Sequence, residues 1–315
     1  MSLKRYVASR LLQVIPTVIA IVTIVFFMVR FLPGSPINVM LGYAGGNEVV
    51  IERLKELYGL NRPVWKQYLT FLWQYAQLDF GYSIVRSRPI VPMIEARIPH
   101  TILLALGGTI IAVIIGVPAG IVSAVNRDTW VDDSVMITAL LGVSTPSFWI
   151  GLMLILVFAV WVPIFPATGT GSLSSPVDIL LHLVLPAITL GTFSASLIAR
   201  ITRSSMLDVL DSSYIQAAKA RGIGERTVVY KHAFMNASIP VVTIVGLFLG
   251  EAIAGTIVIE VVFARTGIGR LLLDGIYSRD YPVVQATVLV IAVGYTLVNL
   301  VTDLTYAWLD PRIRY

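Results

Sequence analysis

Long, predominantly apolar stretches alternate with shorter polar segments along the whole chain. About 20 consecutive apolar residues are needed to cross the roughly 30 Å of hydrocarbon in a bilayer. Stretches of about this length or more lie at residues 11–29, 101–125, 135–161, 179–199, 239–262 and 283–302. The pattern therefore predicts an all-α polytopic membrane protein with six transmembrane helices.

The first of these stretches resembles a signal peptide at its start, because Lys4, Arg5 and Arg10 precede it. The apolar region of a signal peptide is about 7 to 15 residues long and ends at small residues. This stretch is longer, and it runs into Arg30 and Pro33 without such a cleavage site. We therefore expect an uncleaved first span.

Composition supports a membrane protein and argues against several kinds of site. The chain is 57% hydrophobic and 13% charged, and its mean hydropathy is +0.83. It has no cysteine, its three histidines are scattered, and it has no G-x-x-x-x-G-K-[ST] sequence for nucleotide phosphates. We expect no catalytic residue, no metal site and no cofactor in this chain. The net charge of +5 indicates basic loops beside a membrane rather than a nucleic-acid partner.

Positively charged residues beside the spans predict the side that each loop faces, because cytoplasmic loops are enriched in Lys and Arg. Such residues precede the first span, recur in residues 200–238, and end the chain at Arg312 and Arg314. We expect these segments, and with them both termini, to be cytoplasmic. Three arginines in the last external loop oppose this orientation: Arg265, Arg270 and Arg279.

A segment of some 65 residues separates the first two spans. Helical spacing covers residues 48–58 and an aromatic-rich stretch at residues 64–78, with Gly59 and Pro63 between them. We expect a small helical external subdomain here. The predicted organisation is residues 1–32 for the cytoplasmic N-terminus and first span, 33–97 for this subdomain, 98–308 for the core with spans two to six, and 309–315 for a cytoplasmic tail.

The loop at residues 200–238 is longer than two neighbouring helices of a bundle need. Ser213 and Gln216 have the spacing of a capping box, in which each side chain bonds a free N–H of the first helical turn. The spacing predicts a helix that runs to Arg221 and is ended by Gly222 and Gly224.

One face of this helix consists of Tyr214, Ala217, Ala218 and Arg221, by i, i+3 and i, i+4 spacing. The small residues between a ring and a cation make a smooth surface that can seat in a groove on another protein. The residues alone leave a second interpretation open, a solvated amphipathic turn at the lipid headgroups.

A spaced pattern in this loop is shared with a known family. Tyr214, Ala218, Ala220 and Gly222 match Y-x-x-x-A-x-A-x-G, the usual loop form in the dipeptide, oligopeptide and nickel branch of ABC importer permeases. The more general signature of those permeases is E-A-A-x-x-x-G, where this chain has Gln216 in place of glutamate. The chain therefore resembles this branch of the family.

The resemblance extends over the whole chain. Further family motifs follow in order at residues 32–36, 58–63, 79–83, 202–210, 232–237, 279–285 and 310–314. Residues 265–270 depart from the pattern, because the family commonly has a tryptophan and a proline before the glycine there.

The resemblance implies a type I ABC importer permease fold in a bacterial or archaeal cytoplasmic (inner) membrane. It implies pairing with a second homologous permease subunit, two cytoplasmic ATPase subunits that bind ATP and magnesium, and an extracytoplasmic substrate-binding protein. The helix in the loop would be the coupling helix, with docking residues Tyr214, Gln216, Ala217, Ala218, Ala220, Arg221 and Gly222. Substrates of the family include dipeptides, oligopeptides, glutathione and nickel chelates, and the sequence does not choose among them.

Glu251 is the clearest carboxylate in the middle of a predicted span. A charge there costs about 2.5 to 3.5 kcal/mol on insertion scales, and such residues usually face a bundle interior or a cavity. Gly250 and Gly255 beside it allow another helix to approach closely. We expect these residues on the translocation path or a permease interface, with a purely structural hydrogen bond as the alternative. Glu260, near the outer end of the span, is expected at the membrane interface.

Other acidic residues suggest no chemistry. Asp128, Asp132 and Asp133 are expected to form a solvated cluster that caps a helix. An ion-coupled transporter or channel would need several paired charges within the spans. An intramembrane enzyme would need a nucleophile and a base within the bilayer. The sequence has neither pattern.

Overall fold

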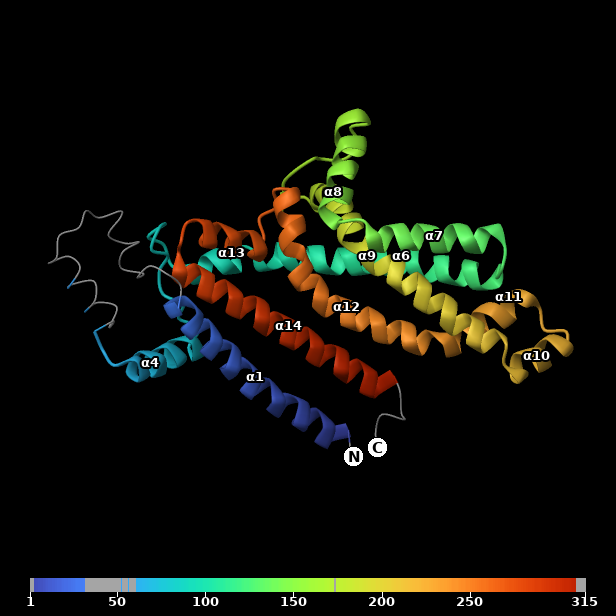
Figure 1. Cartoon of the computed structure of the whole chain (residues 1–315), viewed down its shortest axis with the longest axis horizontal. Helices are drawn as coiled ribbons and strands as arrows, with labels where there is room; N and C mark the ends of the chain where they lie inside the picture. Colours follow the sequence, from blue (N-terminus) through green and yellow to red (C-terminus); the bar gives the residue numbers. More distant parts are fainter. Residues whose placement is uncertain (1–2, 32–51, 53–55, 57–60, 173, 310–315) are drawn as a thin grey trace. The chain divides into compact units, whose positions relative to one another are not determined.

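The computed structural model describes residues 3–31, 52, 56, 61–172 and 174–309, and most of these residues are helical (Figure 1). The helices are α1 (Leu3–Phe31), α4 (Val64–Ala76), α5 (Ile90–Glu95), α6 (Ile98–Val125), α7 (Trp130–Ser144), α8 (Ser147–Ile155), η1 (Leu156–Trp161), α9 (Pro176–Leu210), α10 (Ser213–Ala220), α11 (Glu225–Thr227), η2 (Val228–Phe234), α12 (Met235–Val262), α13 (Ile268–Tyr277) and α14 (Tyr281–Leu309). Within the described ranges, β-structure is limited to an isolated bridge between Tyr82 and Pro89. The predicted all-α class is confirmed.

The chain divides into two compact units. Unit 1 comprises Met1–Val7, His100–Thr266 and Leu297–Tyr315, and unit 2 comprises Ala8–Pro99 and Gly267–Thr296. Unit 1 therefore contains nearly all of the helices from α6 to α12, whereas α4, α5 and α13 belong to unit 2. The domain boundaries expected from the sequence follow membrane topology rather than packing, and they stay a prediction.

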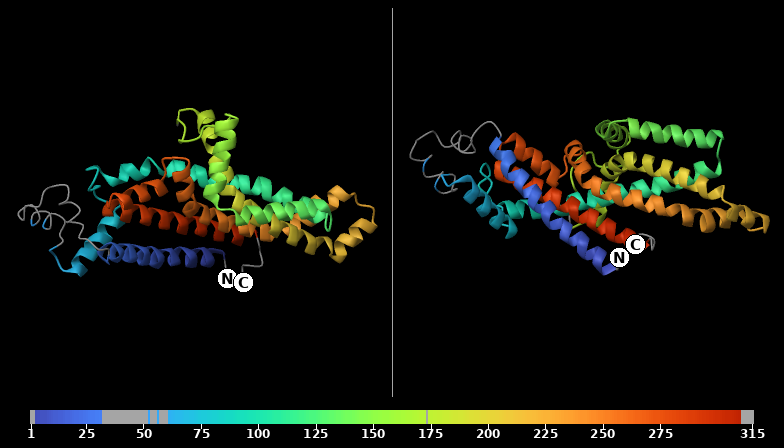
Figure 2. Two further views of the ribbon diagram at one scale, coloured as in Figure 1. Left: turned by 45° about the horizontal axis from the view of Figure 1, so that its top comes forward. Right: turned by 60° about the horizontal axis from the view of Figure 1, so that its bottom comes forward.

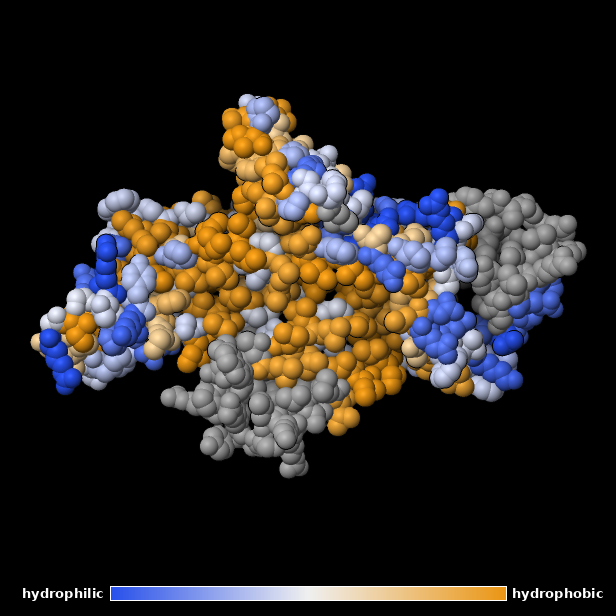
Figure 3. All heavy atoms as spheres, turned by 180° about the vertical axis from the view of Figure 1, so that it is seen from behind, coloured by the Kyte–Doolittle hydropathy of each residue, from blue (hydrophilic) through white to orange (hydrophobic). Residues whose placement is uncertain are grey.

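The described residues include four helical stretches that are long and apolar enough to cross a membrane. These are Ile90–Val125, Pro176–Leu210, Glu225–Val262 and Tyr281–Thr302, and they contain the second, fourth, fifth and sixth predicted spans. Leu12–Met28 of α1 is a shorter apolar helix, and α7 with α8 and η1 adds a fifth span if the pair is counted as one. On the face drawn in Figure 3, hydrophobic residues gather over the middle of the helices, and hydrophilic residues gather at the end that carries α10. The membrane character is confirmed, and the count of six spans stays a prediction.

The third predicted span is broken in its middle. The sequence predicts one span over residues 135–161, but α7 and the helix that starts at Ser147 meet at an angle of 104° (Figures 1 and 2). The bend lies at Thr145, whose backbone is extended, and at Pro146, which has no N–H and disfavours helix in the residue before it. Other prolines, such as Pro118 in α6 and Pro186 in α9, lie inside continuous helices.

Within unit 1, α6 and α9 approach each other closely because α6 carries glycine at the contact. A Cβ on Gly120 would lie 2.5 Å from the carbonyl oxygen of Ala199, and one on Gly116 would lie 2.6 Å from that of Ala195. Such distances leave no room for a side chain. Further along the same contact, a Cβ on Gly191 of α9 would lie 2.6 Å from the carbonyl oxygen of Gly108 in α6.

Unit 2 has its own core, formed by Val22, Tyr75, Phe80, Ile90, Ile94, Leu271, Val283, Ala286 and Leu289. The hydroxyl groups of Thr23 in α1 and Tyr68 in α4 lie 2.6 Å apart. The helix predicted over residues 64–78 is therefore present as α4 and packs against α1. The helix predicted over residues 48–58 lies mostly outside the described residues.

Candidate functional site

Helix α10 lies where the sequence predicts it, but its start differs. Its N-cap is Ser212 rather than Ser213, and no side chain caps it. The Gln216 amide nitrogen donates to the carbonyl oxygen of Asp211 at 3.4 Å instead of reaching back to the first turn. The predicted capping box is therefore wrong, because the helix begins one residue earlier than the box requires.

The end of α10 is a defined stop. Gly222 has φ +76°, a conformation that glycine adopts at little cost. Its N–H donates to the Lys219 carbonyl at 2.9 Å, and the Ile223 N–H donates to the Ala218 carbonyl at 3.3 Å. These two bonds form a Schellman motif, which satisfies carbonyl groups at the end of the helix. The predicted role of Gly222 in ending the helix is confirmed.

One aliphatic side chain of α10 packs into the core of unit 1. Ile215 is fully buried, in a cluster with Ile121, Ala124, Met206, Val228, Val229, Ala233 and Ala237. These residues come from α6, α9, η2 and α12, so α10 rests on the ends of several long helices. Sequence reasoning missed this anchor, although Ile215 is the only large aliphatic residue of α10.

Opposite Ile215, most of the predicted docking residues face outward. Exposed side chains belong to Tyr214, Gln216, Ala217, Ala220 and Arg221, and Gly222 is exposed as well. Ala218 is half-buried. Asn236 donates to the Tyr214 hydroxyl at 3.1 Å, which holds the ring at one end of this face.

Helical extensions replace most of the predicted loop at residues 200–238. Helix α9 continues to Leu210, and helical structure resumes at Glu225 and runs through η2 into α12. Only α10 and short turns lie between them. Short turns therefore connect α10 to α9 on one side and to the helical stretch that runs into α12 on the other.

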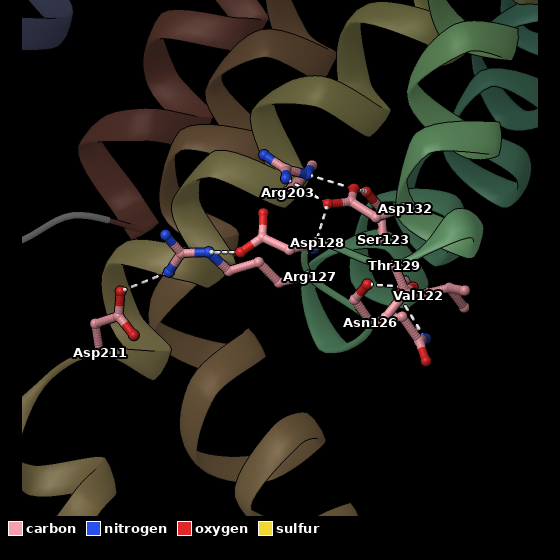
Figure 4. A network of polar contacts seen from close by, with 9 residues as sticks. All are labelled: Val122, Ser123, Asn126, Arg127, Asp128, Thr129, Asp132, Arg203 and Asp211. Atoms are coloured by element: carbon pink, nitrogen blue, oxygen red, sulfur yellow. Dashed lines mark hydrogen bonds and ion pairs between the residues drawn. The ribbon is translucent and has the colours of Figure 1, made fainter.

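A buried carboxylate joins α6, α7 and α9 (Figure 4). Asp132, at the start of α7, is 2% exposed and receives two hydrogen bonds from Arg203 of α9, at 2.7 Å from Nε and 2.5 Å from Nη2. The Ser123 hydroxyl of α6 and the Asp128 backbone N–H also donate to it. The expectation of a solvated cluster is wrong for Asp132, because the planar guanidinium offers the bidentate partner that a buried carboxylate needs.

Arg127 extends this network to the start of α10 (Figure 4). It lies 3.3 Å from Asp128 and 3.3 Å from Asp211, the residue that ends α9. These side chains are more than half exposed, so each of these ion pairs contributes little to stability.

A cavity of about 380 Å³ lies in unit 1, and Glu251 is in its wall. Its polar lining consists of Thr109, Thr145, Ser147, Thr189, Ser194 and Glu251. The break between α7 and α8 therefore lines the same cavity as a carboxylate. Gly255 also lines the cavity, and the neighbouring Gly250 is buried.

Glu260 has a different environment from the expected one. It is 1% exposed, and the hydroxyl of Thr101 donates to it at 2.7 Å. The hydrogen bond to a neighbouring helix offsets part of the cost of this burial. The position of Glu260 at the membrane interface stays a prediction. Arg265, also 1% exposed, donates to the carbonyl oxygen of His182 at 2.8 Å.

In unit 2, two motifs that are far apart in the sequence meet at Asp280. This carboxylate is 2% exposed and accepts hydrogen bonds from the Ser83 hydroxyl and from the backbone N–H groups of Ile84 and Val85. Sequence reasoning recognised both motifs but gave no reason for their pairing. The contact fixes the loop at residues 83–85 against the start of α14.

The histidines do not gather into a site. His182 lies 2.8 Å from the carbonyl oxygen of Asp178 and 3.1 Å from its carboxylate, within one helical turn. His100 and His232 lie on other elements. Over the part of the chain that the structure describes, no group of three or more such ligands could hold a metal ion.

Several known proteins are similar to this chain in sequence or in fold. The chain is 40% identical to the dipeptide transport system permease protein DppB of Alkalihalophilus pseudofirmus, over 98% of this chain and 99% of that protein. It is 41% identical to the glutathione transport system permease protein GsiC of Escherichia coli, over 98% and 99%. An inward-facing structure of the MetNI methionine ABC transporter has a similar fold, with a TM-score of 0.58 at 17% identity over 70% of this chain and 97% of that one.

The family assignment rests on most of the chain. Residues 116–315 match the family described as binding-protein-dependent transport system inner membrane component. The two relatives extend the match to nearly the full length, and the helical fold agrees with that of an importer's membrane subunit. The chain therefore belongs to this family, and it is a transmembrane permease subunit of an ABC importer in the dipeptide and oligopeptide branch.

Proposed function

We propose that this permease forms, with a second homologous permease, the translocation path for dipeptides, oligopeptides or closely similar peptides. An extracytoplasmic binding protein delivers the solute, and two cytoplasmic ATPase subunits that bind ATP and magnesium drive the transport. Peptides are favoured because the two relatives are named for dipeptide and glutathione transport, and glutathione is itself a tripeptide.

The observation that carries this proposal is the construction of α10. Its aliphatic side chain is buried, its end is fixed by a Schellman motif, and its exposed face presents Tyr214, Ala217 and Arg221. A helix held in this way moves as a rigid piece and can transmit a push from a docked ATPase. The solvated turn at the headgroups, the alternative interpretation, has no need of such an anchor.

The proposed path passes Glu251. A carboxylate in a cavity within the spans can hold the ammonium group that a peptide carries at its N-terminus. The hydroxyl groups of Thr109, Thr145 and Ser194 in the same cavity wall can bond peptide carbonyl groups. Gly250 and Gly255 place no side chain on this part of α12.

The proposed orientation places α10 and both termini in the cytoplasm. Residues 33–97 then form the external subdomain, residues 98–308 the permease core, and residues 309–315 a cytoplasmic tail. Because the chain has no native cysteine, single cysteines introduced at Ser213 and Ser172 report the two sides of the membrane. The orientation predicts that an impermeant reagent labels Ser213→Cys from the cytoplasmic side and Ser172→Cys from outside, and the reverse pattern would invert it.

The docking role is tested by Ala217→Trp in the reconstituted importer, with Ser134→Trp as a matched control. Both residues are exposed and small, and Ser134 lies on α7 outside the proposed docking face. Ala217→Trp should leave the subunit inserted but abolish the stimulation of ATP hydrolysis by the loaded binding protein, whereas Ser134→Trp should retain it. Full stimulation and uptake with Ala217→Trp would refute the docking assignment.

A further inference from the structure

We propose that Asp132 and Arg203 form a positioning joint that couples movement of α10 to the cavity wall through α7. The inference rests on the proposed function of α10. It adds a residue pair that touches neither the docking face nor the cavity. The joint would make α7 and α9 move together when α10 is pushed.

The joint is nearly rigid because of its geometry. The Asp132 carboxylate receives four hydrogen bonds, two of them from the planar guanidinium of Arg203. The side chain of Asp132 is 3% exposed, and that of Arg203 is 26% exposed. A bidentate pair fixes direction as well as distance, so α7 cannot slide along α9 at this point without breaking both bonds.

One end of the joint is linked to α10. Arg203 lies in the last two turns of α9, one turn before Met206, whose side chain packs in the same buried cluster as Ile215. Asp211, the C-cap of α9, accepts a hydrogen bond from Gln216 of α10. A displacement of α10 therefore acts on the part of α9 that holds Arg203.

The other end of the joint is linked to the cavity. Helix α7 is 15 residues long, which corresponds to about 22 Å, and runs from the Asp132 turn to Ser144. Its last turn lies against α9 as well, because a Cβ on Gly142 would lie only 2.2 Å from the Ser196 hydroxyl oxygen. Gly142 and the adjacent break at Thr145 line the cavity that contains Glu251. Movement at Asp132 therefore reaches the cavity wall along one helix.

The test measures solute taken up per ATP hydrolysed in the reconstituted importer. Asp132→Asn keeps the volume and one acceptor but removes the charge, and Arg203→Lys keeps the charge but removes the bidentate geometry. Arg127→Ala is the matched control, because it lies in the adjacent turn and its ion pairs are exposed. We expect uptake per ATP to fall about fivefold or more in Asp132→Asn, less in Arg203→Lys, and not at all in Arg127→Ala.

Normal assembly of Asp132→Asn with an unchanged ratio of uptake to ATP hydrolysis would overturn the proposal. The ratio separates coupling from stability, because a merely structural pair would reduce the amount of complex and leave the ratio unaltered. If Ala217→Trp remains fully coupled, the proposed docking function fails as well. If Ala217→Trp is uncoupled and Asp132→Asn is not, the joint alone fails.

A second measurement decides the case in which a variant does not assemble. Spin labels on cysteines at Trp130 of α7 and Ala217 of α10, both exposed, report the distance between the two helices in the full-length subunit. We expect a wider distance distribution in Arg203→Lys and Asp132→Asn than in the unaltered pair. An unchanged distribution would contradict the joint.

Discussion

Among the described residues, Asp132 of unit 1 and Asp280 of unit 2 are both buried, but their charges are compensated differently. Asp132 in unit 1 is bonded to the guanidinium of Arg203, a side chain 71 positions away on another helix. Asp280 in unit 2 is bonded to the Ser83 hydroxyl and to backbone N–H groups of one loop. A charged side-chain partner joins two helices at a point, whereas backbone donors fix the shape of a loop. The Asp132–Arg203 pair is therefore suited to the proposed transmission of movement between helices. The Asp280 contact holds its loop in place.

The largest expected effect comes from removing the cation of unit 1. Arg203→Ala leaves Asp132 buried without its counter-ion, and we expect the free energy of unfolding of the purified subunit to fall by about 3 to 5 kcal/mol. Replacing both residues by apolar ones, Asp132→Leu with Arg203→Met, should recover much of that loss. Chemical unfolding in detergent measures both variants, and a loss below about 1 kcal/mol for Arg203→Ala would remove the contrast between the units.

A smaller effect is expected in unit 2. Asp280→Asn keeps one oxygen acceptor but loses the charge that strengthens the bonds from Ser83 and Ile84, so we expect a loss of about 1.5 to 3 kcal/mol. Arg86→Ala is the matched control in the same loop, because its ion pair with Asp274 at 3.2 Å is partly exposed. Equal losses for Asp280→Asn and Arg86→Ala in the same unfolding assay would show that burial of Asp280 carries no special cost.

Backbone packing in unit 1 provides a test that involves no charge. Gly120→Ala places a Cβ against the carbonyl oxygen of Ala199, so α6 and α9 must separate, and we expect a loss of about 1 to 3 kcal/mol. Gly224→Ala is the control, since a Cβ there meets no atom within 4 Å and its φ is −60°. Thermal unfolding compares the two variants, and equal midpoints would mean that α6 and α9 are not held at this distance.

The smallest effect is expected from the exposed part of the Asp132 network. Arg127→Ala removes ion pairs to Asp128 and Asp211 whose side chains are largely exposed, and we expect less than about 1 kcal/mol. That small cost should shrink further at high salt. A loss as large as that of Arg203→Ala would mean that the exposed pairs, not the buried joint, hold α9.

Features carried by local sequence were predictable. The helix at α10 and its stop at Gly222 follow from a short pattern and from the conformational freedom of glycine. The long apolar helices follow from hydropathy over about 20 residues. Glu251 was noticed in the sequence because a charge in a span is costly, and it lines a cavity, but its role on the path stays a prediction.

Features that depend on distant partners were not predictable. Three neighbouring aspartates look alike in the sequence, and only the position of Arg203 on α9 makes Asp132 different. The burial of Glu260 was not predictable either, because Thr101, its hydrogen-bond donor, lies on another helix. Sequence reasoning found no difference between Pro146 and Pro118. Nevertheless, the chain bends at Pro146, whereas α6 continues through Pro118.

Cysteine protection can show whether the exposed face of α10 docks on the ATPase subunits as proposed. Because the chain has no cysteine, Ala217→Cys supplies a single thiol on this face, and Ser134→Cys supplies an exposed control on α7. We expect assembly with the ATPase subunits to slow maleimide labelling of Ala217→Cys about tenfold or more, because water is excluded from the centre of an interface, and to leave labelling of Ser134→Cys unchanged. Equal labelling of Ala217→Cys in the free and the assembled permease would contradict the proposed docking.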